Sequence, residues 1–289
     1  MKANDWEEID PWWKVHAREQ QEELVELYKL MEKLSDKWKQ SDSRFDQDPL
    51  AVDWSESSNK TGPLNTGREE NWSDWLAHLL RSSPGYFIRE LFAEEFDSKP
   101  EYVKREKAFQ DEEESDRRAD ILLYFEGEGI SIEVKLNDEN YGKTGHTAHL
   151  IERRDDRDWT HFLLLPKYNE KLLKNVFGSK IRWSEEPRAV IPSERYSDVE
   201  VIYWKDVSLA LRRILLYGDN LPPHWEASAY LFITLVEQKL FRIHPYSFVE
   251  RNVIEDSDAT FSDIDRLKTI DVKDQIEYLS SLMEVEKHE

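Results

Sequence analysis

The chain has 289 residues, of which 61 are acidic and 40 basic, giving a formal net charge of −21 at pH 7. This length accommodates one large domain or two small ones, and an aromatic content of 12% excludes an intrinsically disordered chain. The absence of cysteine excludes disulfide scaffolds, thiolate zinc sites and cysteine nucleophiles.

Residues 1–67 are predicted to form a helical arm followed by a linker. Between residues 12 and 38, apolar side chains recur at the helical period, among them Leu24, Met31 and Trp38. Such a stripe is typical of a helix that packs on the body of a protein, and a dimerisation helix is the alternative. Residues 41–67 are rich in Ser, Asn, Gly and Pro, which indicates a linker or a long loop.

Residues 68–217 are predicted to form a mixed α/β core. A helix begins near Glu69 with an apolar stripe that includes Trp72 and Leu80, and a short helix follows at residues 86–96. Runs with β-strand character predict strands at residues 103–109, 119–125, 130–136, 161–165 and 199–204. A helix at residues 207–217 ends this core, and residues 218–289 are predicted to be a helical C-terminal extension.

The two strands on either side of residues 126–129 are predicted to pair as a hairpin, because Glu-Gly-Glu-Gly is typical of a turn. With the turn centred between residues 127 and 128, Asp120 lies directly opposite Lys135, and Leu122 lies opposite Glu133. Because alternate residues share a face of a strand, Asp120, Glu133 and Lys135 then converge on one face of the sheet.

Two carboxylates beside a lysine favour binding of a hard cation such as Mg²⁺, which prefers oxygen ligands and keeps waters for a substrate phosphate. Such an ion lowers the pKa of a bound water and stabilises charge on a phosphoryl oxygen. Lys135 would orient the water, accept its proton or neutralise the developing charge. The alternative is an exposed cross-strand ion pair worth at most about 1 kcal/mol.

These residues resemble a known family. An Asp followed about a dozen residues later by Glu-x-Lys, here within ADILLYFEGEGISIEVKL, resembles the signature of the PD-(D/E)XK nuclease superfamily. The segment from Glu70 to Leu80 resembles the E-N-x-S-x-x-L-A-x-L-L opening helix of its prokaryotic branch. The resemblance covers roughly Arg68 to Tyr217. It implies a restriction-endonuclease-like α/β fold, with a mixed β-sheet flanked by helices, an N-terminal helical arm and a C-terminal helical tail.

The resemblance also implies the roles of individual residues. Asp120 and Glu133 would bind Mg²⁺, for which Mn²⁺ would substitute, and the backbone carbonyl of Val134 would be a third ligand. Lys135 would be the catalytic lysine, and Glu70 the helix acid that completes the metal site. The family often has a Gln in the helix that follows Glu-x-Lys, and this sequence has none there. The candidates to replace it are Tyr141, Lys143, Thr144 and His146. The candidates to bind substrate are Lys143, Thr144, His146 and Arg118.

The sequence therefore predicts a metal-dependent nuclease that hydrolyses phosphodiester bonds, with DNA as the expected substrate. By resemblance, its setting would be prokaryotic defence against foreign DNA. The alternatives are an RNase and a catalytically silent subunit that acts as a binding or assembly module. A protein partner or a second copy would bind through the helical ends. No apolar run approaches the roughly 20 residues of a membrane span, so we expect a cytoplasmic protein with no membrane partner.

Overall fold

The computed structural model describes residues 5–54, 60–61, 64–92, 96, 98–110, 116–136, 144–166, 182–183, 189–191, 197–253 and 272–285. The chain divides into two compact units, and each is described here by itself. The sheet unit comprises residues 57–214 and 220–236, and the helical unit comprises residues 1–56, 215–219 and 237–289.

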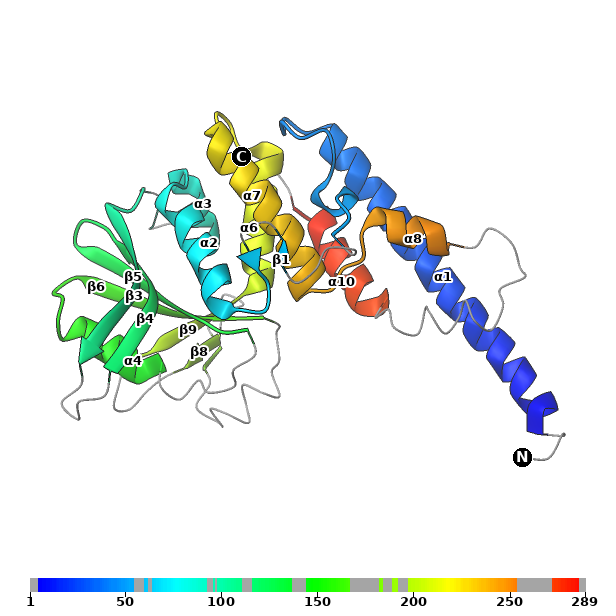
Figure 1. Cartoon of the computed structure of the whole chain (residues 1–289), viewed down its shortest axis with the longest axis horizontal. Coiled ribbons are helices and arrows are strands. Elements are labelled where there is room, and N and C mark those ends of the chain that lie inside the picture. Colours follow the sequence, from blue (N-terminus) through cyan, green and yellow to red (C-terminus); the bar gives the residue numbers. More distant parts are fainter. Residues whose placement is uncertain are drawn as a thin grey trace. The chain divides into compact units, whose positions relative to one another are not determined.

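A mixed sheet forms the centre of the sheet unit (Figure 1). It has seven strands, in the order β3-β4-β5-β6-β9-β8-β7. The strands are β3 (Tyr102–Gln110), β4 (Asp116–Tyr124), β5 (Glu128–Val134), β6 (Asp158–Leu165), β7 (Arg182–Trp183), β8 (Ala189–Ile191) and β9 (Val199–Tyr203). Strands β5, β6 and β9 are parallel, and the other pairs are antiparallel. The predicted mixed α/β fold is confirmed. The sequence did not predict β7 and β8, because two or three residues are too few to show a period.

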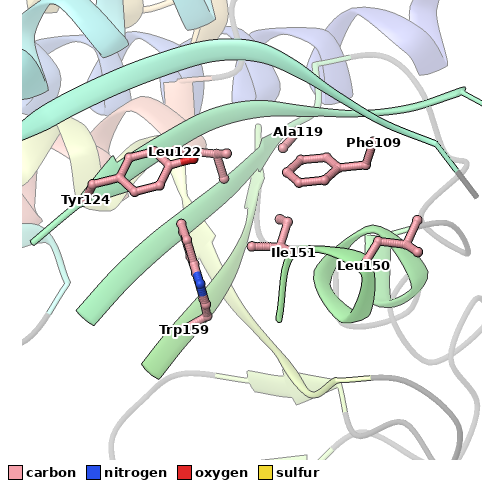
Figure 2. Packing of buried hydrophobic residues seen from close by; sticks show 7 residues of the cluster. All are labelled: Phe109, Ala119, Leu122, Tyr124, Leu150, Ile151 and Trp159. Carbon is pink, nitrogen blue, oxygen red and sulfur yellow. The ribbon is translucent and has the colours of Figure 1, made fainter. Parts of the chain in front are cut away.

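Helices pack on both faces of this sheet. They are α2 (Glu69–Arg81), α3 (Gly85–Leu91) and α4 (Thr144–Glu152), while α6 (Trp204–Tyr217) and α7 (Pro223–Leu235) pack against α2. Helix α4 lays Leu150 and Ile151 against Trp159 of β6 and its neighbours (Figure 2). Just beyond α3, Phe92 packs against Phe162, which comes three residues after Trp159 in β6. Because successive strand residues point to opposite faces, α3 and α4 lie on opposite sides of the sheet.

Helix α7 belongs to the sheet unit, although the sequence placed it in the C-terminal extension after residue 217. Trp225 of α7 is buried, and its indole N–H donates a hydrogen bond to the Leu79 carbonyl of α2 at 2.9 Å. Phe232 of α7 packs against Trp72 with ring centroids 6.0 Å apart. The aromatic side chains that α7 buries against α2 therefore place this helix in the sheet unit, although it comes after the loop near residue 218.

The helical unit joins the two ends of the described chain. It contains α1 (Asp5–Lys39), the 3₁₀ helix η1 (Pro49–Ala51), most of the π-helical turn η4 (Val236–Leu240), α8 (Tyr246–Asn252) and α10 (Val272–Met283). The Lys37 ammonium of α1 donates hydrogen bonds to the carbonyls of Met283 (3.0 Å) and Val285 (2.5 Å) at the end of α10. The predicted arm and tail therefore form one unit instead of two separate extensions.

The segment predicted as a linker at residues 41–67 also contains regular structure. Besides η1, it holds a short antiparallel pair, β1 (Lys60–Thr61) and β2 (Leu64–Asn65). The Asp48 carboxylate accepts a hydrogen bond from the Leu50 N–H at 2.9 Å and so caps η1. Among the helices that the model describes, none combines the length and apolarity that crossing a bilayer requires.

Candidate active site

The β4–β5 hairpin brings Asp120 level with Glu133. Its observed register pairs Ile121 with Ile132 and Leu122 with Ser131. The predicted register was therefore wrong by two residues, and Asp120 does not lie opposite Lys135. The turn is centred between Glu126 and Gly127, where Gly127 adopts a φ of +80°, a conformation that glycine accepts readily.

The strand alternation is interrupted at Asp120. In the β3–β4 ladder, Arg105 pairs with Ile121 and Lys107 with Ala119, but Glu106 and Asp120 between them do not form a ladder pair. Glu106 has a φ of +48°. Ala119 and Leu122 pack in the same cluster against α4 although they are an odd number of residues apart (Figure 2). The Asp120 carboxylate accepts a hydrogen bond from the Val134 N–H at 2.8 Å. This bond fixes Asp120 against the end of β5.

Glu133 and Lys135 form a largely buried ion pair at the end of β5. The Lys135 ammonium lies 2.9 Å from the Glu133 carboxylate, and the two side chains are 12% and 19% exposed, respectively. Burial, and then the nearby charge of Asp120, raises the pKa of Glu133 to about 7. Burial works to lower the pKa of Lys135, but the charge and hydrogen bond of Glu133, together with the charges of Glu69 and Asp120, raise the pKa overall. Lys135 is therefore protonated at neutral pH.

Asp120 is the second carboxylate of this group, and its pKa is also raised. Burial raises its pKa, against the lowering effect of its hydrogen bond with Val134 and of the Lys135 charge. Within the described ranges, no three Asp, Glu, His or Cys side chains are grouped closely enough to bind a metal ion by themselves. Two carboxylates with a carbonyl and waters remain a donor set that suits Mg²⁺, which usually binds through one or two carboxylates and keeps several waters. The residues present therefore fit this ion.

Helix α2 contributes Glu69 to this cluster, whereas the sequence pointed to Glu70. The Glu69 carboxylate accepts a hydrogen bond from the Leu136 N–H at 2.8 Å, and its charge acts on both Glu133 and Lys135. The Glu70 side chain is exposed. Helical periodicity could have identified Glu69, because it lies three and seven residues before the buried Trp72 and Leu76, in phase with the apolar stripe.

Arg105 of β3 connects α2 to Asp120, and sequence reasoning missed it. Its guanidinium donates hydrogen bonds to the Ser73 hydroxyl (2.8 Å), the Asp74 carboxylate (2.7 Å), the Asp120 carbonyl (3.1 Å) and the Glu70 carbonyl (3.2 Å). The Arg105 side chain is only 13% exposed. No pattern marked it, because it stands in a run of four charged residues.

The four substrate-binding candidates occupy different places. Arg118 is exposed on β4, where it pairs with Ala108 of β3. Thr144 is the buried first residue of α4, and His146 is half-buried on the same helix. Lys143 and Tyr141 lie outside the described residues. The structure therefore places two candidates on α4 and one on the outer part of the sheet.

A buried histidine links β5 to α4 beside the cluster. The Nδ1 atom of His161 lies 2.6 Å from the Ser131 hydroxyl, and its Nε2 lies 3.2 Å from the Glu152 carboxylate. Glu152 also accepts a hydrogen bond from Ser197, just before β9. Burial lowers the pKa of His161 more than the charge of Glu152 raises it. The neutral ring of His161, on β6, therefore joins β5 to α4, and Glu152 extends the network to Ser197.

This lowered pKa predicts a pH dependence of stability. Between the folded-state pKa of His161 and its unfolded value near 6.5, the unfolded chain binds more protons. The contribution of His161 is thus complete above pH 6.5 and is lost as the pH falls below it. Urea unfolding at pH 7.5 and 5.5 measures this loss, which we expect to be smaller in His161→Gln. The variant His78→Gln, at an exposed position of α2, is the control. Equal losses in wild type and His161→Gln would contradict the assignment.

Comparisons with known proteins do not assign this chain to a family. No protein-family model matches the sequence, and no curated protein matches it significantly. A crystal structure of the small subunit (R.BspD6I2) of the heterodimeric restriction endonuclease R.BspD6I is similar to this chain with a TM-score of 0.27 and 12% identity. The match covers 69% of this chain and 98% of that subunit. A similarity of this size does not establish a shared function.

Proposed function

We propose that this chain is a metal-dependent nuclease that hydrolyses phosphodiester bonds, with DNA as its substrate. The observation that carries the proposal is the largely buried group of Asp120, Glu133 and Lys135, where the middle of β4 meets the end of β5. Two carboxylates with raised pKa values beside a protonated lysine are costly to bury, and such groups concentrate at functional sites.

The residues have distinct roles in this proposal. Asp120 and Glu133, with the Val134 carbonyl, would hold Mg²⁺, and the hydrogen bond from the Val134 N–H orients Asp120. When bound, the ion would activate water and stabilise charge on the phosphate. Lys135 is already protonated, which supports a role in neutralising the charge that develops as water attacks phosphorus, rather than in accepting a proton. Glu69 holds the main chain directly after Lys135 through the Leu136 N–H.

The test is a nuclease assay on plasmid, linear duplex and single-stranded DNA, and on RNA, with Mg²⁺, Mn²⁺ or EDTA. We expect DNA cleavage with either ion and none with EDTA. Mg²⁺ binding, measured by calorimetry, is expected to weaken strongly in Asp120→Asn and Glu133→Gln, which retain the side-chain shape. Cleavage of RNA alone would make the protein an RNase. No cleavage and no metal binding would instead favour the silent subunit, and the role in defence would lose its support.

A further inference from the structure

Cationic and aromatic side chains gather on the edge strand β3 and its neighbour β4. Lys104 lies over the rings of Tyr102 and Tyr124, at 5.2 and 5.4 Å from their centroids. Lys107 lies 5.0 Å from the centroid of Phe109 and donates a hydrogen bond to the Tyr124 hydroxyl at 3.1 Å. We call these five residues the β3 patch. Figure 2 shows Phe109 and Tyr124 packed in the cluster beneath it.

The patch has positive charge available for a ligand. In the described part of the chain, neither Lys104 nor Lys107 forms an ion pair with a carboxylate, whereas the neighbouring Arg157 pairs with Asp155 at 2.9 Å. Lys104 is exposed and Lys107 is half-buried. In a chain with a net charge of −21, an anionic ligand needs a local cationic surface, and two lysines held over aromatic rings form one.

The patch also offers a ring for stacking. Tyr102 is 39% exposed and stacks on the buried Tyr124, with centroids 4.2 Å apart and planes inclined by 21°. A base whose partner strand is absent can stack on an exposed aromatic ring, whereas a paired base inside a duplex presents only its edges. Strand β3 is an edge of the sheet, so none of the strands that the structure describes covers its outer side.

The position of the lysines relates the patch to the proposed active site. Lys104 pairs with Leu122 and Lys107 pairs with Ala119, so the two lysines flank the row of the sheet that holds Asp120. Neighbouring strands are about 4.8 Å apart, and residues in a strand about 3.3 Å. A phosphate chain contacting both lysines would therefore pass close to Asp120 and Glu133. This adjacency favours a nucleic-acid ligand over an acidic protein.

We propose that the β3 patch binds a single strand of nucleic acid, with phosphates on Lys104 and Lys107 and an unpaired base stacked on Tyr102. The inference rests on the proposed function, because the polymer is placed beside the proposed cleavage site. Binding and cleavage are nevertheless separate measurements. Binding is therefore measured with the Lys135→Ala protein and Ca²⁺ or EDTA, so that a protein without nuclease activity still reports on the patch.

The experiment measures fluorescence anisotropy with single-stranded and duplex oligonucleotides at several salt concentrations. Each phosphate contact contributes about 0.7 to the slope of log affinity against log salt in single-strand binding. Raising the salt concentration from about 50 to about 200 mM should therefore lower the oligonucleotide affinity of the parent protein about sevenfold more than that of the variant Lys104→Ala/Lys107→Ala. Tyr102→Ala should weaken single-strand binding at least about fivefold, and Tyr102→Phe should not. Duplex binding should be insensitive to either change at Tyr102.

The control Lys39→Ala/Lys273→Ala removes two exposed lysines from the helical unit and changes the net charge equally. It should keep the wild-type affinity and salt slope. The proposal would be overturned if Lys104→Ala/Lys107→Ala kept the wild-type salt slope. It would also be overturned if Tyr102→Ala weakened duplex binding as much as single-strand binding. Displacement of the oligonucleotide by poly-glutamate at equal charge concentration would assign the patch to an acidic protein and would also overturn it.

Discussion

Replacing Lys135 with alanine is expected to lower the rate of DNA cleavage roughly a thousandfold while the protein stays folded. The lysine lies 2.9 Å from the Glu133 carboxylate and its charge also acts on Asp120, and the loss of one preorganised charge in an active site typically costs about 10²–10³ in rate. Single-turnover cleavage in Mg²⁺ measures the effect, and circular dichroism verifies the fold.

Two comparisons separate the role of Lys135 from its effect on Glu133. Without Lys135, the pKa of Glu133 is expected to rise further above about 7, so part of the loss at neutral pH would reflect a protonated Glu133. The assay is therefore repeated at pH 8.5. Activity that returns there would show that the lysine acts only by keeping Glu133 ionised. Lys99→Ala, an exposed position of the same unit, is the matched control and should retain wild-type activity.

Replacing Arg105 with alanine is expected to lower the free energy of unfolding by about 3 kcal/mol, since several hydrogen bonds from one charged group are lost at once. The Asp120 carbonyl and the Ser73 hydroxyl both lose a partner, at the point where α2 meets β4. Urea unfolding followed by tryptophan fluorescence measures the loss. Cleavage should also fall, because the Asp120 main chain would lose one of the hydrogen bonds that position it.

Conservative and distant substitutions test whether the geometry of Arg105 matters. Arg105→Lys keeps the charge but cannot make the forked hydrogen bonds, so it should recover only a small part of the stability. Arg18→Ala, on the exposed surface of α1, should change the free energy of unfolding by less than about 0.5 kcal/mol. If Arg105→Ala unfolds at the wild-type urea concentration, Arg105 does not join α2 to the sheet in the way that we describe.

The sequence predicted the elements well where a pattern is local. The strand in β6 and the amphipathic helix α2 follow from continuous or periodic apolar residues that one segment supplies. The hairpin register was two residues off because Glu-Gly-Glu-Gly offers two glycines to the turn. The structure uses Gly127 for its positive φ. Gly129 is needed for another reason, since a Cβ there would lie 2.7 Å from the ring of Trp159, thirty residues away.

The candidate site was predicted only in part for the same reason. Asp120, Glu133 and Lys135 are brought together by one hairpin, and an error of two residues preserves the face on which strand residues lie. Glu69 and Glu70 differ by one residue on a helix, so the family pattern could mark the wrong one, although the phase of the apolar stripe favours Glu69. Arg105 depends on contacts with α2 and β4 that no local pattern encodes.

The hydrogen bonds from Lys37 to the end of α10 impose an order on folding during synthesis. Lys37 and Met283 are separated by 246 positions, so at about 5–20 residues per second the ribosome needs roughly 12–50 s to supply the partner after α1 has been made. Throughout that interval the buried stripe of α1 lacks α10. The sheet unit is complete at residue 236 and can therefore fold before α10 has been made, whereas the helical unit cannot.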